Sequence, residues 1–200
     1  MAEKRLTKEI AEQFLANDTI VDLRDFTVID DEAAEILCGY EGERLHLDGL
    51  TSLSDMAAED LREYSGSLSL NGLFAGIVKS VLDDPVFEQE SESGVLRLIA
   101  GDPEEVIVTI DAGRTEVAVF GVRWKGHFPE IQPRSVGVLY WGDFMPSQFK
   151  QLLATVVRAA QEVRRAECGK CRYCGQMMGP EHMHGDVCHG CAERHEGIVH

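Results

Sequence analysis

Two closely spaced cysteine pairs near the C-terminus limit what this chain can fold into more than any other feature. The pairs are Cys171-Arg-Tyr-Cys174 and Cys188-His-Gly-Cys191, and thirteen residues separate them. A C-x2-C turn places two sulfurs beside one metal ion, and the intervening loop is long enough to fold back with the second pair. The spacing therefore predicts one tetrahedral, structural Zn²⁺ site made of four thiolates: Cys171, Cys174, Cys188 and Cys191.

Cys168 adds a further C-x2-C spacing with Cys171, which is also part of the ligand run of iron–sulfur ferredoxins. The fourth cysteine and the Cys-Pro ending of that run are missing here, so zinc explains the later pair better. Cys168 is then either a spare thiol or an alternative ligand to Cys171. A Cys168 thiol that reacts without loss of zinc would instead make the protein a redox sensor.

The residues that follow each pair resemble the two halves of a treble-clef or zinc-ribbon-like finger. Gly175 follows the first pair, as in a zinc knuckle, and Cys191-Ala-Glu-Arg-His opens a short helix as a second knuckle would. The resemblance covers residues 171–195. It implies a closed, non-catalytic site in which zinc stabilises a terminus that is too small to fold alone.

A cluster of histidines in the same region allows an enzymatic alternative: His182, His184, His189, His195 and His200. In that interpretation Glu181-His182 is the general-base end of an HNH-type nuclease, whose finger also carries two C-x2-C pairs. However, the Asp-His-x-x-Pro run is absent, and the connector between the pairs is too short for a catalytic hairpin. We favour a solvent-exposed loop with three methionines packed under the finger: Met177, Met178 and Met183.

The charge of the chain restricts its partners. Its 35 acidic and 19 basic residues give a formal net charge of -16. Before residue 150 there are 29 acidic and 12 basic residues, whereas from residue 150 onward there are six and seven. The acidic part repels nucleic acid and anionic membranes. If the alternative of nucleic-acid binding holds, contact is expected only at the finger, through a basic set at its base and surface: Arg164, Arg165, Lys170, Arg172 and Arg194.

The distribution of apolar residues and cysteines predicts a cytoplasmic protein. No stretch approaches the roughly 20 apolar residues of a membrane helix, and residues 1–10 carry no apolar signal core behind their charges. Five of the six cysteines lie between residues 168 and 191, which is metal-site spacing and not a disulfide framework. Lone Cys38 is expected to be a small buried apolar residue.

The N-terminal region repeats itself with a period of 24 residues. Residues 21–37 match residues 45–61, a third copy begins at Leu68, and a half copy precedes them at Leu6. In each full copy an alternating apolar pattern predicts a short strand, and an Ala-Ala-x-x-Leu run predicts a helix with a thin inner face. One such unit cannot bury its own apolar face, so the copies must stack.

This pattern resembles the leucine-rich repeat in its cysteine-containing bacterial and F-box-like variety, whose unit reads L-x-L-x-x-C-x-x-I-T-D before a helix. Phe26 and Leu50 stand where that family places Cys or Asn, and residues 29–31 and 53–55 stand at I-T-D. The resemblance covers about residues 6–82 and implies an array with an extended surface. Two full copies are fewer than the roughly three that a solenoid needs, so we expect the next region to cap the array.

The middle of the chain has the pattern of an antiparallel meander followed by one helix. After a polar, acidic connector at residues 83–94, strands are predicted at 95–100, 106–110, 115–124 and 135–141, with turns between them, the last at 126–133. Connections this short suit antiparallel pairing. The run 115–124 is apolar at successive positions, so we expect a central strand covered on both faces.

A helix is predicted at residues 146–166. Phe149, Leu152, Leu153, Val156, Val157 and Ala160 form one apolar stripe. Pro146 suits the first helical turn. This helix should cover one face of the meander and lead directly into the finger.

Together these features predict an α+β protein with a leucine-rich-repeat-like region at 1–82, a meander plus helix at 83–167, and a zinc finger at 168–200. No glycine-rich phosphate loop, nucleophile elbow or paired His–carboxylate motif points to catalysis. We therefore expect a non-enzymatic, zinc-binding adaptor whose acidic surface suits a basic protein partner. The alternative is a finger that binds nucleic acid or cleaves it as an HNH nuclease does.

Overall fold

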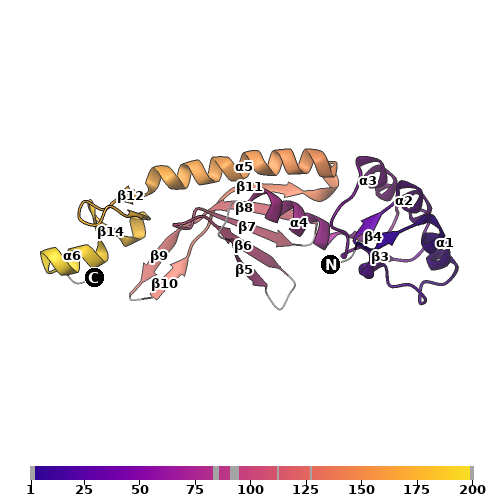
Figure 1. Cartoon of the computed structure of the whole chain (residues 1–200), viewed down its shortest axis with the longest axis horizontal. Coiled ribbons are helices and arrows are strands. Elements are labelled where there is room, and N and C mark those ends of the chain that lie inside the picture. The colour runs from indigo at the N-terminus through magenta and orange to yellow at the C-terminus, as the bar shows by residue number, and fades with distance from the viewer. Residues whose placement is uncertain (1–2, 83–85, 91–94, 112, 127, 199–200) are drawn as a thin grey trace.

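The computed structural model describes residues 3–82, 86–90, 95–111, 113–126 and 128–198. In these residues the N-terminal helices, a five-stranded sheet and the C-terminal finger follow one another along the long axis of an elongated molecule (Figure 1). The predicted α+β class is confirmed, since helices and mostly antiparallel strands both occur along the chain. No helix in this described part is both long and apolar enough to cross a membrane.

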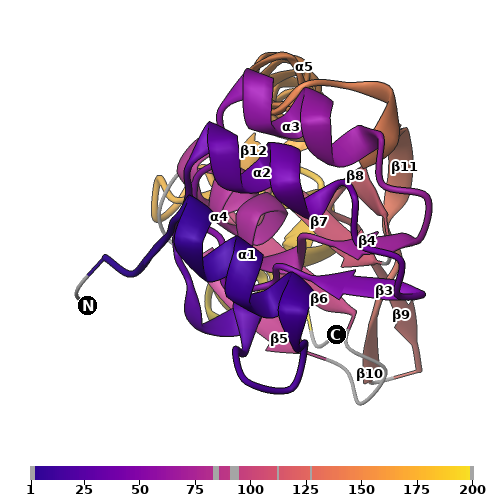
Figure 2. The ribbon, with the colours of Figure 1, turned by 90° about the vertical axis from the view of Figure 1, so that its right-hand side faces the viewer.

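Short strands alternate with helices through the first 82 residues, as the repeat predicts. The elements are β1 (Arg5–Leu6), α1 (Lys8–Ala16), β2 (Val28–Ile29), α2 (Asp31–Leu37), β3 (Arg44–His46), α3 (Asp55–Arg62), β4 (Ser67–Ser69) and α4 (Asn71–Val81). β1 pairs in parallel with β2, and β3 pairs in parallel with β4. Helices α1, α2 and α3 lie side by side over these strands, with α2 in the middle (Figure 2). The 24-residue period thus corresponds to one strand-and-helix unit.

The stacked units are held together by leucines from the strands and alanines from the helices. Leu45, Leu47 and Leu50 are fully buried, and so are Ala33 and Ala34 of α2. The small alanines let the helices lie close to the strand layer, which explains the Ala-Ala pair in each copy. Ser54 caps α3 by accepting a hydrogen bond from the N–H of Ala57 at 3.0 Å.

Two glycines are required where consecutive turns of the array touch. A Cβ added at Gly49 would overlap the carbonyl oxygen of Arg24, and one added at Gly72 would overlap that of Asp48. Neither glycine has a positive φ. The close approach of one turn to the next, and not a special backbone conformation, therefore excludes a side chain at both positions.

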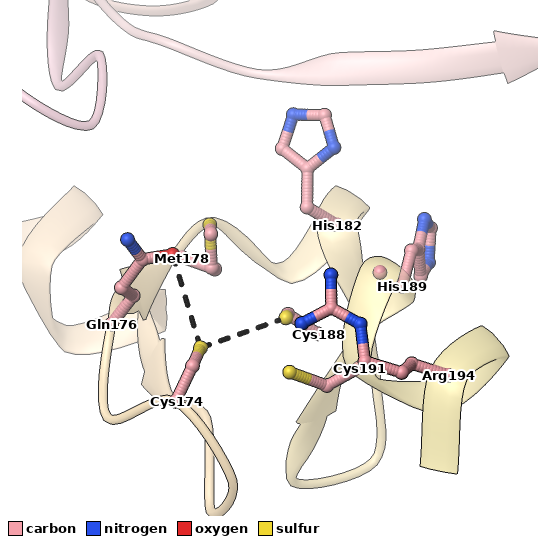
Figure 3. A pocket seen from close by; sticks show the side chains of 9 residues that line it. Cys174, Gln176, Met178, His182, Cys188, His189, Cys191 and Arg194 are labelled. Carbon is pink, nitrogen blue, oxygen red and sulfur yellow. Dashed lines mark hydrogen bonds between the residues drawn. The ribbon is translucent and has the colours of Figure 1, made fainter. Parts of the chain in front are cut away.

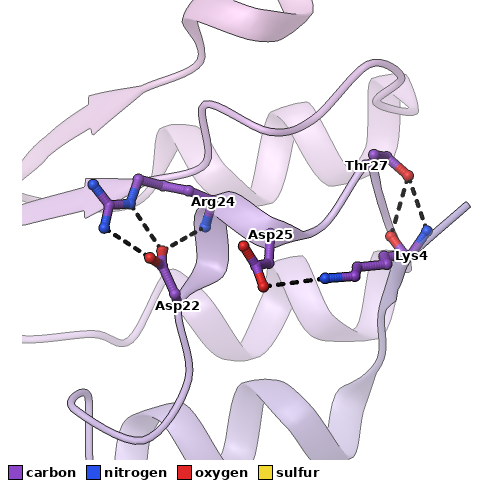
Figure 4. A network of polar contacts seen from close by, with 5 residues as sticks. All are labelled: Lys4, Asp22, Arg24, Asp25 and Thr27. Atoms are coloured by element: carbon purple, nitrogen blue, oxygen red, sulfur yellow. Dashed lines mark hydrogen bonds and ion pairs between the residues drawn. The ribbon is translucent and has the colours of Figure 1, made fainter. Parts of the chain in front are cut away.

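Polar contacts fasten the first strand to the loop before β2 (Figure 4). The Lys4 ammonium lies 3.1 Å from Asp25, and the backbone N–H of Lys4 donates to the Thr27 hydroxyl at 3.1 Å. Hydrogen bonds from the Arg24 side chain and backbone to Asp22 lower the pKa of that carboxyl to about 2. Since these ion pairs are exposed, they fix the geometry of the turn more than they stabilise the fold.

We expect Leu47→Ala to lower the free energy of unfolding by about 2–5 kcal/mol, the usual cost of a cavity in a well-packed core. Leu47 is fully buried between the strands and the helices. Met56→Ala is the control, because Met56 is 66% exposed on α3 and its loss should change stability by less than about 0.5 kcal/mol. Urea unfolding followed by circular dichroism measures both. Equal effects of the two substitutions would contradict the stacked packing.

The central sheet has the strand order β11-β8-β7-β6-β5 and is antiparallel throughout. Its strands are β5 (Val86–Glu90), β6 (Leu96–Ala100), β7 (Val106–Asp111), β8 (Arg114–Val119) and β11 (Arg134–Tyr140). The predicted meander is confirmed. However, β5 lies inside the stretch 83–94 that we expected to be a connector, of which residues 83–85 and 91–94 lie outside the described part. Its polar sequence gave no strand signal because it forms an edge of the sheet, where one side faces solvent.

The strand expected at residues 115–124 is broken in two. β8 ends at Val119, and β9 (Val122–Lys125) turns away to pair with β10 (Phe128–Ile131), which lies in the predicted turn 126–133. At the break, a Cβ on Gly121 would lie 2.8 Å from the carbonyl oxygen of Gln132. The prediction of one continuous strand covered on both faces was wrong. The apolar residues after Gly121 lie in the β9–β10 hairpin, which extends toward the finger (Figure 1).

Two helices cover one face of the sheet: α4 and α5 (Pro146–Glu167). Phe149, Leu153 and Val157 of α5 are buried against the strands, which confirms the predicted helix and its stripe. Phe74 of α4 stacks on Trp141 with ring centroids 4.1 Å apart. The last helix of the array is therefore part of the sheet's core, so the sheet region covers the open end of the array as expected.

Candidate metal centre

The finger consists of two small hairpins and one helix. Its elements are β12 (Gly169–Lys170) paired with β13 (Met177–Met178), β14 (Met183–His184) paired with β15 (Val187–Cys188), and α6 (His189–Glu196). The first hairpin turns through Cys171 and Cys174, with Gly175 in the left-handed region at φ 73°. Cys188 ends β15, and Cys191 lies in the first turn of α6. The first pair therefore lies in a hairpin turn, and the second pair lies where a hairpin leads into a helix, as the knuckle resemblance implies.

The structure brings all four predicted cysteine sulfurs together. They lie within 4.8 Å of one another, and the Cys174 and Cys188 sulfurs are 3.9 Å apart. Two sulfurs bound at about 2.3 Å to a tetrahedral zinc are separated by about 3.8 Å. Cys171, Cys188 and Cys191 are buried, whereas Cys174 is exposed. None of the four forms a disulfide, so the cluster could hold a metal ion.

The donor chemistry of the cluster suits a soft divalent metal. Backbone N–H groups of Cys174 and Cys188 lower the pKa of Cys171 to about 6, and the Cys188 N–H lies 3.3 Å from the Cys171 sulfur. Burial, together with the neighbouring sulfurs, raises the pKa of Cys191 to about 12. A metal that binds here must therefore displace protons from thiols. Four sulfur donors favour Zn²⁺ over oxygen-seeking Mg²⁺ or Ca²⁺.

A buried ion pair joins the finger to the long helix. The Arg164 side chain on α5 is 1% exposed, and its guanidinium donates to the Glu181 carboxylate, which is 5% exposed. Arg164 also donates from Nε to the carbonyl of Glu104 at 3.2 Å, and its guanidinium lies 5.5 Å from the Phe120 ring centroid. One arginine thus contacts the finger, the β6–β7 turn and the end of β8.

The β9–β10 hairpin holds the finger at a second point. The indole N–H of Trp124 donates to the backbone carbonyl of Glu181 at 2.9 Å. The Trp124 ring also meets the His182 ring edge-on, with centroids 6.1 Å apart. The finger is therefore placed by α5 and by β9 together, which explains why β9 leaves the sheet.

Most side chains of the basic set that we predicted for nucleic-acid contact form ion pairs with carboxylates of the chain. Besides the buried Arg164, Arg165 pairs with the carboxylate of Glu105, and Arg172 pairs with those of Asp186 and Glu196. Among the described residues, only Lys170 and Arg194 of the set have no ion pair. Arg164 is enclosed with Glu181, whereas Arg165 pairs with Glu105 and keeps a side chain that is 58% exposed. Contact of the set with nucleic acid remains a prediction.

The other finger residues that the sequence singled out, Cys168 and the three methionines, differ in their burial and position. Cys168 lies outside the sulfur cluster, and burial raises the pKa of its thiol, which lowers its reactivity. Its expected role as an alternative ligand therefore has no geometric support. Met178 and Met183 pack under the finger as predicted, whereas Met177 is 48% exposed.

The described histidines do not form a metal-ligand cluster. The His195 ring stacks on Tyr173 with centroids 4.5 Å apart, whereas the His182 and His189 ring centroids lie 6.3 Å apart beside the cysteines (Figure 3). His200 lies outside the described residues. The Glu181 carboxylate, which precedes His182 in the HNH alternative, forms an ion pair with Arg164. Sequence reasoning missed the Arg164–Glu181 pair, since these two ordinary charged side chains lie seventeen positions apart in the chain.

Comparisons with protein-family models, with curated proteins and with solved structures give no match to this chain. The leucine-rich-repeat resemblance has no family match to support it and depends on the repeat residues alone. The metal centre depends on the convergence of the four sulfurs.

Proposed function

We propose that this protein is a non-enzymatic interaction module whose C-terminal finger is held by one Zn²⁺. The observation that carries the proposal is the convergence within 4.8 Å of four sulfurs from the two hairpins and the start of α6. A metal closed by four thiolates keeps no open position for a substrate or an activated water, which is the pattern of structural zinc. The metal would therefore stabilise the finger and would have no catalytic role.

The small core of the finger supports a structural role for the metal. Its buried apolar cluster consists of Cys171, Val187, Cys188, Cys191 and Ala192. Three of these five residues are the proposed ligands themselves. So little apolar surface does not stabilise a folded unit of this size, and such units use a metal in place of a larger core.

The layout of the molecule supports an adaptor role. The strand-and-helix array and the finger lie at opposite ends of the molecule, separated by the sheet and the 22-residue helix α5 (Figure 1). A helix of that length spans about 33 Å. Two surfaces so far apart can contact two partners at once. The leucine-rich-repeat-like array would supply one surface and the finger the other.

A row of glutamates marks the array surface that we assign to a basic protein partner. Glu12, Glu35 and Glu59 occupy corresponding positions on α1, α2 and α3, and each directly follows an alanine. All three are exposed, and the described residues provide no ion pair for any of them. Residues 1–82 contain 17 acidic and seven basic side chains, so the row lies in an acidic region. Lysine or arginine side chains of a partner would complement it.

Changing Glu12, Glu35 and Glu59 together to glutamine is expected to weaken binding of a basic partner by roughly tenfold at low salt, since each exposed pair contributes modestly. A fluorescent lysine-rich peptide serves as the first probe, and fluorescence anisotropy at low and high salt measures its affinity. The matched control removes three acidic charges elsewhere, at Asp143, Glu162 and Glu193, which are also exposed. The same loss of affinity in both variants would contradict a specific binding row.

A further inference from the structure

We infer that an open hollow beside the four cysteines binds the phosphate group of a phosphate ester. The hollow has a volume of about 600 Å³, which is within the range of small-ligand sites. Four side chains that can donate hydrogen bonds line it: Gln176, His182, His189 and Arg194. Gln176 lies just before β13, His182 lies just before β14, and His189 and Arg194 belong to α6 (Figure 3). Cys174, Cys188 and Cys191 line the same hollow, so the donors lie beside the sulfurs.

The charge of the lining sets this hollow apart from the rest of the molecule. Acidic residues outnumber basic ones by 35 to 19 in the chain, yet none of the described carboxylates lines the hollow. Arg172 and Arg164, elsewhere in the finger region, are both paired with carboxylates. Arg194 is exposed and, within the described residues, has no ion pair. A guanidinium kept free of carboxylates in so acidic a chain is available to an anionic ligand.

The fold places these donors on one side of the metal centre. Arg194 follows Cys191 by three residues on α6, so the two side chains share a face of the helix. The His182 and His189 ring centroids lie 6.3 Å apart, and the Trp124 ring meets the His182 ring edge-on with centroids 6.1 Å apart. A planar guanidinium and imidazole rings that line one hollow match the oxygens of a phosphate, which accept several hydrogen bonds at once.

The thiolates that line the hollow repel an anion, whereas Arg194 attracts it. The distances from a bound phosphate to these groups decide whether attraction exceeds repulsion. A divalent metal with four thiolates carries a formal charge of -2, and Cys174, Cys188 and Cys191 line the hollow together with Arg194. The thiolate charge is shared with the metal, whereas a phosphate held at Arg194 would contact the guanidinium directly. Because Coulomb energy falls with separation, the inference requires phosphate oxygens that lie nearer to the guanidinium than to the sulfurs. The competing explanation is that Arg194 only offsets the thiolate charge.

The inference rests on the metal-loaded finger of the proposed function, so metal content is measured in every sample. The metal-loaded full chain is titrated with inorganic phosphate, a mononucleotide and a short single-stranded oligonucleotide, and NMR follows the arginine and histidine side-chain signals. Arg194→Gln should weaken binding by roughly tenfold or more, as expected for a lost charge-assisted hydrogen bond. Arg158→Gln is the matched control, because Arg158 is exposed on α5 and its loss removes the same charge.

Each outcome has one meaning. Binding that Arg194→Gln weakens and Arg158→Gln leaves intact, with full metal in both variants, supports the hollow; the tightest probe then identifies the source of the phosphate. Equal weakening in both variants, or no binding of any probe by metal-loaded protein, overturns this inference alone. Reduced metal content in Arg194→Gln with unchanged phosphate affinity also overturns it and assigns Arg194 to the thiolates. Wild-type protein that holds no metal contradicts the proposed function as well.

Discussion

Cys188→Ser is expected to abolish stoichiometric metal binding and to unfold the finger, while the array and the sheet stay folded. Cys188 is buried, and its sulfur lies 3.9 Å from that of Cys174. The binding free energy of structural zinc is about 10–16 kcal/mol in isolated fingers, which exceeds what the five-residue apolar cluster can supply. Elemental analysis gives the metal-to-protein ratio, and NMR dispersion of residues 169–198 reports the fold of the finger.

Cys168→Ser is the matched control for this prediction. It makes the same chemical change three residues before Cys171, but Cys168 lies outside the sulfur cluster. Its metal content should equal that of the wild type. A chelator should reproduce the Cys188→Ser spectrum in the wild-type protein. Full metal in Cys188→Ser, or the same loss in both variants, would show that the four sulfurs do not form the site.

Arg164→Met is expected to lower the free energy of unfolding by about 3–5 kcal/mol, because it leaves the Glu181 carboxylate buried without its partner. Arg164 is 1% exposed and contacts the finger, the β6–β7 turn and Phe120. Urea unfolding of metal-loaded protein measures the change. Arg158→Met on the exposed face of the same helix controls for the loss of one arginine and should cost little.

A double variant separates the ion pair from simple packing. Arg164→Met with Glu181→Met removes both charges, so it should recover part of the stability that the single variant loses. No recovery would mean that Arg164 acts through its packing and through Glu104 only. Recovery beyond the wild type would mean that the pair positions the finger at a cost in stability.

The same pair predicts how stability depends on pH. Burial pushes the pKa of Glu181 upward, but the hydrogen bond and charge of Arg164 outweigh it, so the pKa lies below its usual value. A carboxyl whose pKa is lowered by folding contributes stability above its unfolded pKa of about 4.3, and that contribution is lost as the pH falls through the folded pKa. The wild type should therefore lose more stability than the double variant on acidification. Identical pH profiles would contradict a charged Glu181.

Patterns of short range were predictable because neighbouring residues alone create them. The 24-residue period encodes one strand and one helix, and a buried Leu47 or Ala33 follows from its position in that unit. The apolar stripe of residues 146–166 needs only helical geometry to face the sheet. The polar strand β5 and the break at Gly121 were missed, because an edge strand and a bent hairpin depend on what the neighbouring segments cover.

The sequence by itself determined the repeat, the meander with its helix, and the four cysteines that meet, since ligand spacing and apolar periodicity can be read from the order of residues within one segment. Only the tertiary structure decided which charged side chains are buried and which remain free. Arg164, Arg172 and Arg194 look alike in the sequence, yet one is enclosed with Glu181, one pairs with surface carboxylates and one faces the hollow. The physical reason is that the environment of a charge is set by segments far away in the chain, which local patterns do not record.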